Sequence, residues 1–193
     1  MDGVLSAAPC ARVVDAEAVL GTPGDQRHCW CQFDRWPMAD YRAMPVDQKR
    51  AHLVAQVSAA GPSPGVIATL ADEPVGWASV APRPTFPRIG SSPSMSTTET
   101  RQDLDDAGIW SVTCFVVRTR YRRTGVSAVL LDAAVEHARA CGAHTLEGYP
   151  VDAAERPGAG SGTYRGRLST FLAAGFVVVA RQSAGRAVVR LAL

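Results

Sequence analysis

The stretch from residue 109 to residue 141 constrains the fold of this chain more than any other. It opens with IWSVTCFVV, a β-branched and aromatic run that is too short for a helix and typical of a buried strand. The residues that follow the next loop have helical spacing, with Asp132, Glu136 and Arg139 opposite an apolar face made of Val126, Val129, Leu130, Ala133 and Ala134. Gly142 is typical of a helix end. We therefore predict a strand, a tight basic loop and an amphipathic helix.

The loop between this strand and this helix is suited to binding an anion. The first amides of a helix have no intrahelical partner and lie at the positive end of its dipole, so residues 124–127 can cradle an anion. Gly125 lets phosphate oxygens approach the backbone closely, because it has no side chain. Four arginines flank this point and favour a diphosphate over a carboxylate: Arg118, Arg120, Arg122 and Arg123.

Two other phosphate-binding motifs do not fit this loop. A nucleoside-triphosphate loop needs a lysine followed by Ser or Thr after its second glycine. A dinucleotide-binding fold needs three spaced glycines and an acidic residue about 20 positions further on. The stretch contains neither pattern.

The loop sequence resembles the acyl-CoA loop of the GCN5-related N-acetyltransferase (GNAT) superfamily. That loop usually reads Gln or Arg, x, x, Gly, x, Gly or Ala, and this chain has Arg122-x-x-Gly125-x-Ser127. Ser127 departs from the last position only by a hydroxyl. Downstream, Phe171-Leu-Ala-Ala-Gly-Phe176 is similar to the family's Tyr-x-x-x-Gly-Phe ending of the last helix. The resemblance covers roughly residues 65–193.

The resemblance implies an α/β fold with a mixed, mostly antiparallel twisted sheet of six or seven strands. The sheet is expected to splay between its fourth and fifth strands and to carry helices on both faces. With 193 residues, of which 47% are hydrophobic, the chain can form one domain. We expect a single acyltransferase domain over residues 1–193, with its core in 65–193 and with 1–64 forming part of the acceptor wall.

Local patterns predict the remaining elements. Residues 11–20 fit a strand or a short helix, and residues 25–41 are ambiguous. We predict a long irregular connection over residues 82–108, bordering the acceptor pocket, and a flexible Gly-rich spacer over residues 151–162. The other expected elements are a helix over 45–59, a hairpin of strands at 65–71 and 74–81, a strand at 144–149, a helix over 164–174 and a final hairpin of strands at 176–181 and 187–193.

The family resemblance also implies an activity. Acetyl-CoA would be a co-substrate, and its acetyl group would pass directly to a primary amine, expected to be that of a small molecule, in a ternary complex without a metal. Main-chain groups of Phe115 and Val117 would pair with the pantetheine like an added strand, and a nearby amide would polarise the thioester carbonyl. The expected cofactor-binding residues are Phe115, Val116, Val117, Arg122, Arg123, Thr124, Gly125, Val126 and Ser127.

The family's usual catalytic residues are missing from this chain. The glutamate on the fourth strand is replaced by Ser111, which could only hold a water, and the tyrosine acid is replaced by Phe171. Glu147 and Tyr149 share one face of the fifth strand, so we predict that either group reaches the acceptor amine, with Glu147 as the base or, alternatively, in a structural ion pair. Tyr164 is the candidate acid, with packing as the alternative.

The acceptor cannot be chosen from the sequence. Trp30, Phe33, Arg35 and Trp36 are candidate acceptor contacts, and simple packing under the sheet is the alternative. A cleft lined by carboxylates would suit polyamines or aminoglycosides, whereas these residues would suit an aromatic or amino-acid-like amine. Two other functions stay open: a non-catalytic acyl-CoA-binding regulatory module and an antibiotic-modifying acetyltransferase.

Cysteine and histidine positions suggest no metal site. The chain has five cysteines, an odd count unlike that of a secreted disulfide framework, and Cys29-Trp-Cys31 is too closely spaced for the usual metal or redox motif. Cys114 could be a nucleophile, but an apolar strand raises the pKa of a thiol and so lowers its reactivity. We therefore expect Cys114 to pack in the core. We expect His137 to lie on a solvated helix face.

Charge and hydropathy bear on partners and location. The formal net charge is +2, and Lys49 is the single lysine among 20 basic residues, which suggests a GC-rich, bacterial genome more than a nucleic-acid surface. With no signal peptide and no apolar run of transmembrane length, we expect a cytoplasmic protein that does not associate with membranes. The last strand, residues 188–193, could supply an edge for a homodimer.

Overall fold

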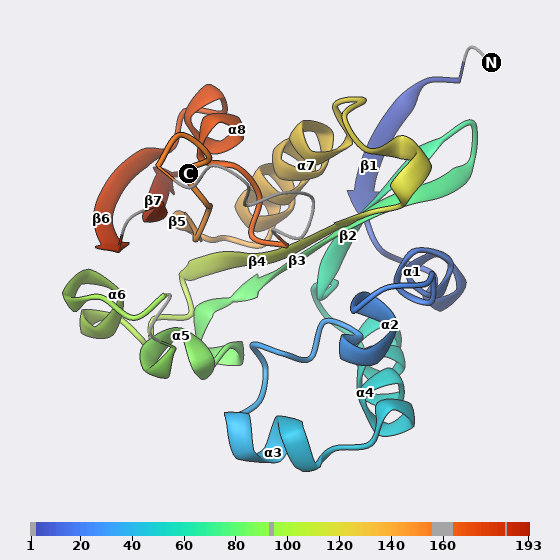
Figure 1. The fold of residues 1–193 in the computed structure, drawn as a ribbon, viewed down its shortest axis with the longest axis horizontal. Coiled ribbons are helices and arrows are strands. Elements are labelled where there is room, and N and C mark those ends of the chain that lie inside the picture. The colour runs from blue at the N-terminus through green and yellow to red at the C-terminus, as the bar shows by residue number, and fades with distance from the viewer. Residues whose placement is uncertain (1–2, 93–94, 156–163, 184) are drawn as a thin grey trace.

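Within the described residues, which are 3–92, 95–155, 164–183 and 185–193, the computed structural model has seven strands in one sheet (Figure 1). The spatial order is β1-β2-β3-β4-β5-β7-β6. All neighbouring pairs are antiparallel except β4 and β5, which are parallel. This arrangement confirms the predicted mixed α/β fold. The strands are β1 (Leu5–Pro9), β2 (Gly65–Leu70), β3 (Glu73–Pro82), β4 (Ile109–Val117), β5 (Thr145–Gly148), β6 (Val177–Ser183) and β7 (Arg186–Ala192).

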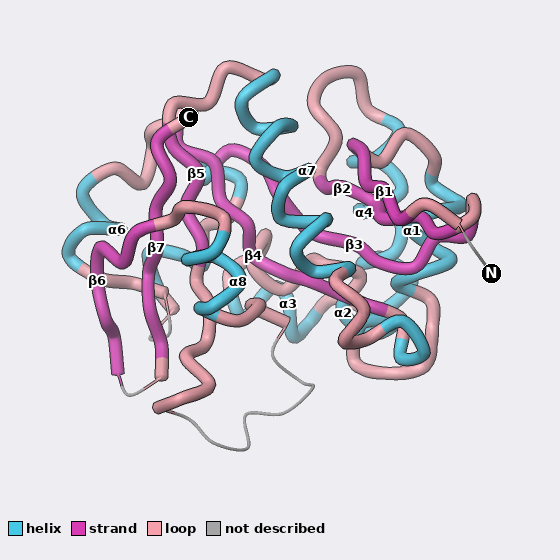
Figure 2. Tube along the Cα trace, turned by 90° about the horizontal axis from the view of Figure 1, so that it is seen from above, coloured by secondary structure: helices cyan, strands magenta, loops and turns pink. Residues whose placement is uncertain are grey.

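Helices cover both faces of this sheet. Figure 1 shows α7 (Val126–Ala140) and α8 (Leu168–Ala173) on one side, and Figure 2 shows α7 crossing over the central strands. One large apolar core fills the space under α7, and a second core packs the opposite face around Trp77. The helices on that opposite side are α1 (Val13–Leu20), α2 (Gln26–Cys29), α3 (Met38–Ala43), α4 (Val46–Ser58), α5 (Arg88–Ser91) and α6 (Thr98–Gln102).

Helix α7 has the face that its sequence predicted, with one correction. Val126, Leu130 and Ala134 are buried, and Gly142 follows the helix with a φ of 80° that favours glycine. His137, which we expected on a solvated face, is buried. Its Nε2 lies 3.0 Å from the carbonyl oxygen of Ser63, in the loop before β2. This hydrogen bond replaces one to water, so the imidazole can be buried.

Strands β4 and β5 diverge as expected. They pair only along residues 109–112 and 145–148, whereas β4 continues to Val117. At the point of divergence the β3–β4 register shifts: Ser79 pairs with Cys114 and Val80 with Val112, so Thr113 forms a β-bulge. The N–H of Phe115, just beyond the bulge, donates to the carbonyl of Tyr164 at 2.6 Å, so residues near 164 lie alongside β4.

Several local predictions are confirmed and others are corrected. The helix over 45–59 and both hairpins are present, and the ambiguous residues 11–20 form α1. Residues 82–108 are not wholly irregular, because they contain α5, α6 and a short 3-10 helix, η1 (Arg83–Thr85). The last helix starts at residue 168 instead of 164, because the preceding residues extend alongside β4. Most of the spacer predicted at 151–162 lies outside the described residues.

Candidate functional site

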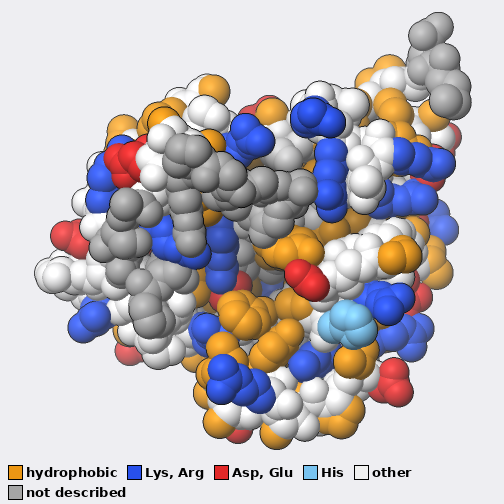
Figure 3. Space-filling view, viewed as in Figure 1, with side chains coloured by type: hydrophobic (Ala, Val, Ile, Leu, Met, Phe, Trp, Pro, Cys, Tyr) orange, Lys and Arg blue, Asp and Glu red, His pale blue; other side chains and the backbone are white. Residues whose placement is uncertain are grey.

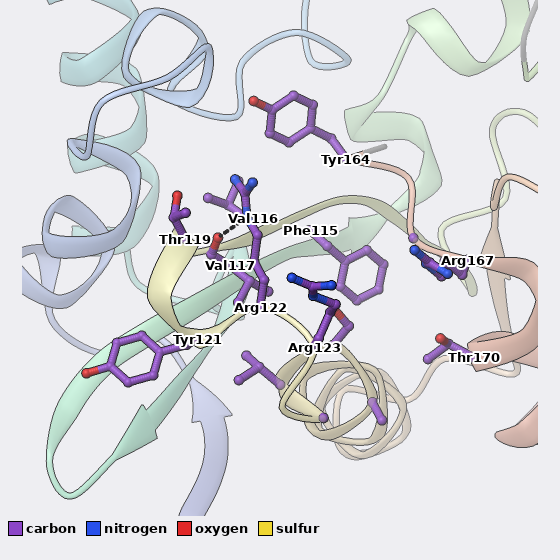
Figure 4. Close-up of a pocket in the computed structure, with 15 residues that line it drawn as sticks. Phe115, Val116, Val117, Thr119, Tyr121, Arg122, Arg123, Tyr164, Arg167 and Thr170 are labelled. Carbon is purple, nitrogen blue, oxygen red and sulfur yellow. Dashed lines mark hydrogen bonds between the residues drawn. The ribbon is translucent and has the colours of Figure 1, made fainter. Parts of the chain in front are cut away.

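A pocket of about 730 Å³ opens between the end of β4, the start of α7 and the segment before α8 (Figure 4). Two parts of the chain that are distant in sequence meet there. One is the stretch from the end of β4 to the start of α7, residues 115–128, and the other is residues 164–170. The lining residues are Phe115, Val116, Val117, Thr119, Tyr121, Arg122, Arg123, Gly125, Val126, Ser127, Ala128, Tyr164, Gly166, Arg167 and Thr170.

The backbone at the start of α7 presents unpaired donors to this pocket. Arg123 and Gly125 both have left-handed conformations, with φ of 66° and 86°, and they bend the loop sharply before the helix. No described residue accepts a hydrogen bond from the N–H groups of residues 123–127. Five successive amides without a described partner, at the positive end of a 15-residue helix, are suited to binding an anion.

The four arginines expected beside this loop do not act together. Arg122 and Arg123 line the pocket, whereas Arg118 and Arg120 turn away and form ion pairs with Glu73. The carboxylate of Glu73, in the β2–β3 hairpin, therefore holds two of the four arginines outside the pocket. The expectation that all four flank one anion is corrected on this point.

Arg167 supplies a cation to the pocket that the sequence did not suggest. Figure 4 shows it across the pocket from Arg123, beside Thr170. The residues before α8 were predicted to be helical, so no local pattern placed their side chains at this site.

Eight of the nine predicted cofactor residues line the pocket. The exception is Thr124, whose hydroxyl donates to the carbonyl of Tyr121 at 2.7 Å. Both main-chain groups expected to meet pantetheine already have partners in the chain. The N–H of Phe115 is bonded to Tyr164, and the carbonyl of Val117 accepts from Nε of Arg122 at 3.2 Å. An added strand on β4 would therefore replace these two bonds.

Three of the four catalytic candidates meet in one buried network away from this pocket. Glu147 is fully buried, and its carboxylate lies 3.2 Å from Nη1 of Arg83 and 2.7 Å from Nε of Arg190. The hydroxyl of Tyr149 donates to the same carboxylate and lies 3.1 Å from Oγ of Ser111. Burial, and then the charge of Glu147, raises the pKa of Tyr149 well above its usual value. This environment is that of the structural ion pair considered as the alternative for Glu147.

Tyr164, the fourth candidate, lies in the pocket itself. Its ring is half-buried, and its hydroxyl donates to Oε1 of Gln26 at 3.3 Å. Burial is the main cause that raises the pKa of Tyr164, so the phenol stays protonated at neutral pH. A protonated hydroxyl at this point can donate a proton or a hydrogen bond.

The predicted acceptor contacts separate into different environments. Trp30 is 7% exposed and packs in the second core. Trp36 lies beside the ring of His52 and donates to Gln32 at 3.3 Å. Phe33 and Arg35 flank the buried carboxylate Asp34 in sequence, and both remain half-buried.

Asp34 connects this segment to the splayed strands. Its two oxygens accept from both terminal nitrogens of Arg165, at 2.7 and 2.8 Å. Arg165 also donates to the carbonyl of Thr113, in the β-bulge, at 2.6 Å. A single guanidinium therefore ties the proposed acceptor wall to the point where β4 and β5 diverge.

The described residues contain neither a metal-binding cluster nor a membrane-spanning helix. No cluster of His, Cys, Asp and Glu among them could hold a metal ion. None of their helices is both long enough and apolar enough to span a bilayer.

All five cysteines are free thiols. Cys114 packs against the second core but is half-buried, not enclosed as expected.

Comparison with known proteins gives one family and many structures of the same fold. The family model described as "Acetyltransferase (GNAT) family" matches residues 26–156. No curated protein gives a significant match. A GCN5-related N-acetyltransferase from Kribbella flavida is 17% identical, with a TM-score of 0.57 over 98% of each chain.

Two further structures were solved with a coenzyme. The protein yncA from Salmonella typhimurium, solved with acetyl-CoA, is 15% identical with a TM-score of 0.55 over 98% of this chain and 94% of its own. The PaiA N-acetyltransferase from Thermoplasma acidophilum, solved with coenzyme A, is 11% identical with a TM-score of 0.56 over 98% of this chain and 99% of its own. At these identities the likeness concerns the fold.

Proposed function

The chain belongs to the GNAT family of acetyltransferases, and on this premise we propose that it transfers an acetyl group from acetyl-CoA to a primary amine of a small molecule. The transfer would be direct, within a ternary complex. The thioester supplies an activated acetyl group whose carbonyl an amine can attack. The protein's part is to hold the thioester, to orient the amine and to manage two protons.

The free amides at the start of α7 are the observation that carries this proposal. The N–H groups of residues 123–127 lack partners among the described residues and face a pocket that also receives Arg123 and Arg167. This combination of helix end and paired guanidinium groups suits a diphosphate. The pocket continues along Phe115 and Val117 toward the β-bulge at Thr113, which supports a donor bound along β4.

We propose Tyr164 as the group that protonates the departing thiolate. It lies in the donor pocket, and its raised pKa keeps its proton available at neutral pH. Glu147 is less suited to the role of base, because two guanidinium groups and a phenol already occupy its carboxylate. Under this proposal the amine loses its proton to water.

The donor site can be tested by isothermal titration with acetyl-CoA. We expect the wild-type protein to bind and the double variant Arg123→Ala, Gly125→Asp to bind at least about a hundredfold more weakly, because it removes one charged contact and adds a repelling carboxylate. Arg120→Ala is the matched control, since that arginine pairs with Glu73 outside the pocket. A wild-type protein that does not bind acetyl-CoA would overturn the proposal.

A non-catalytic acyl-CoA-binding module is the second candidate function. Its support is that Phe171 takes the place of the usual acid and is fully buried against Phe115 and Phe176. Mass spectrometry of a panel of amines incubated with protein and acetyl-CoA separates the two functions. An acetylated product identifies an enzyme, whereas tight binding without any product identifies a binding module.

A further inference from the structure

Arg88, on α5, is a buried guanidinium without a carboxylate partner among the residues that the structure describes. It is 8% exposed. Its guanidinium stacks on the ring of Phe33, 3.9 Å from the centroid. Its hydrogen bonds are long ones, 3.4 Å to the carbonyl of Phe33 and 3.8 Å to Sδ of Met38. Buried arginines are normally paired, because desolvating an unpaired charge is costly.

A second buried cation lies on the same aromatic pair. The rings of Phe33 and Tyr41 meet edge to face at 5.2 Å, and the ammonium of Lys49 lies 3.9 Å from the centroid of Tyr41. Lys49 is 7% exposed and takes part in no ion pair with the described side chains. Each ring of the pair thus carries one cation that forms no ion pair with a described carboxylate.

The local charge balance is positive. Asp34 is the carboxylate with the largest effect on the pKa of Arg88, and Arg165 already binds both of its oxygens. Arg165 and Arg42 add further positive charge near Arg88. Burial lowers the pKa of Arg88, as expected for a cation without enough negative charge around it. A bound anion would offset this deficit.

The surroundings suit an anion that carries an apolar or aromatic body. In Figure 3 the molecule is hollowed near the centre of the face shown, with hydrophobic, basic and acidic side chains around the hollow. The guanidinium of Arg35 stacks on Phe86 at 4.6 Å and is also influenced by Asp34. Aromatic rings and guanidinium groups therefore occur together around Asp34.

This cationic region is linked to the proposed reaction centre through one side chain. The guanidinium of Arg165 donates both to the carboxylate of Asp34 and to the carbonyl of Thr113, in the bulge of β4. A planar guanidinium fork such as that of Arg88 matches a carboxylate in a bidentate manner. Building on the proposed function, we propose that Arg88 binds a carboxylate carried by the acceptor amine, so that the acceptors are amino acids and amino-acid-like compounds.

Matched acceptors test this assignment. L-phenylalanine, L-phenylalanine amide and phenethylamine share an amine and a ring but differ in the carboxylate, and acetylated product can be quantified by mass spectrometry. We expect kcat/KM at least about tenfold higher for the amino acid than for either of the other two. Phosphoethanolamine is tested as a fourth acceptor, because it carries a phosphate in place of a carboxylate. A preference for it over every carboxylate acceptor would overturn the assignment of a carboxylate.

Variants separate binding from structure. Arg88→Met should raise KM for L-phenylalanine about ten- to a hundredfold and leave KM for the amide within about twofold, whereas Arg88→Lys should retain part of the preference. The control is Arg139→Met, an exposed arginine on α7 that pairs with Glu136 and whose loss changes the net charge equally. An equal loss for all three acceptors in Arg88→Met would mean that Arg88 is only structural and would overturn the proposal.

The design also distinguishes this inference from the function on which it rests. If acetyl-CoA binds and the three acceptors react equally, the acceptor assignment fails and the transferase remains. If acetyl-CoA does not bind, the proposed function fails. Ligand-detected NMR with L-phenylalanine and its amide then still decides whether Arg88 holds a carboxylate: selective binding of the amino acid, lost in Arg88→Met, supports the site, and no selective binding overturns it.

Discussion

At the scale of single residues, Glu147 was a candidate base by sequence, but in the fold it is the centre of a buried ion-pair network. Its carboxylate is fully buried between guanidinium groups from η1 and β7, and the phenol of Tyr149 donates to it from its own strand. Removing one member of such a buried network leaves the others uncompensated, which is far more costly than losing a surface pair.

The variant Glu147→Gln is therefore expected to lower the free energy of unfolding by about 3–5 kcal/mol, measured by urea denaturation. The control Glu136→Gln removes an exposed pair with Arg139 and should change the same quantity by less than about 1 kcal/mol. Similar losses in the two variants would contradict a buried network. If folded Glu147→Gln protein keeps full turnover, Glu147 is not the base.

The sequence could predict only part of this network. Period-two spacing placed Glu147 and Tyr149 on one face of a strand and left an ion pair open. Arg83 and Arg190 are 64 and 43 residues away from Glu147, so only the folded sheet identifies them as its partners. The free amides before α7 were predictable, in contrast, because helix ends leave them unpaired wherever the chain folds that way.

At the scale of elements, the segment before α8 departs most from expectation. Residues 164–167 looked helical by sequence, but Tyr164 bonds β4 and Gly166 adopts a φ of 78°. A Cβ at Gly166 would lie 3.1 Å from the ring of Phe171 and 3.2 Å from that of Phe115. Backbone conformation and tertiary packing therefore both favour glycine here, which local spacing cannot reveal.

Gly166→Ala should consequently lower stability by more than backbone strain alone. We expect a loss of about 2–3 kcal/mol in thermal or urea unfolding, together with weaker acetyl-CoA binding, because this glycine lines the donor pocket. Gly142→Ala is a matched control, since that residue has a φ of 80° but open space around its missing side chain. If the two variants lose equal stability, the contact with the two rings contributes nothing.

At the scale of the whole molecule, the groups with raised pKa predict loss of stability at alkaline pH. A hydrogen bond with Cys114, followed by burial, raises the pKa of Cys31 well above its usual value of 9.0, and burial raises the pKa of Tyr149 above 10.0. Both groups bind their protons more tightly when folded. Their stabilising effect is therefore complete below about pH 9 and is lost as the pH rises beyond that.

Thermal unfolding measured from pH 7 to pH 11 tests this behaviour. The melting temperature should stay nearly constant up to about pH 8.5 and then fall. The double variant Cys31→Ser, Tyr149→Phe should show a shallower fall, because it lacks both groups. A wild-type melting temperature that rises or stays level up to pH 11 would exclude the predicted linkage.

The order of the strands has a further consequence for biosynthesis. Strand β7 lies between β5 and β6 in the sheet, although the ribosome makes it after both. Until β7 docks, β5 has one open edge and Glu147 lacks the guanidinium of Arg190. The nascent chain can assemble β1 to β4 early, but it cannot join β5 to β6 through β7 until the segment Arg186–Ala192 has left the ribosome.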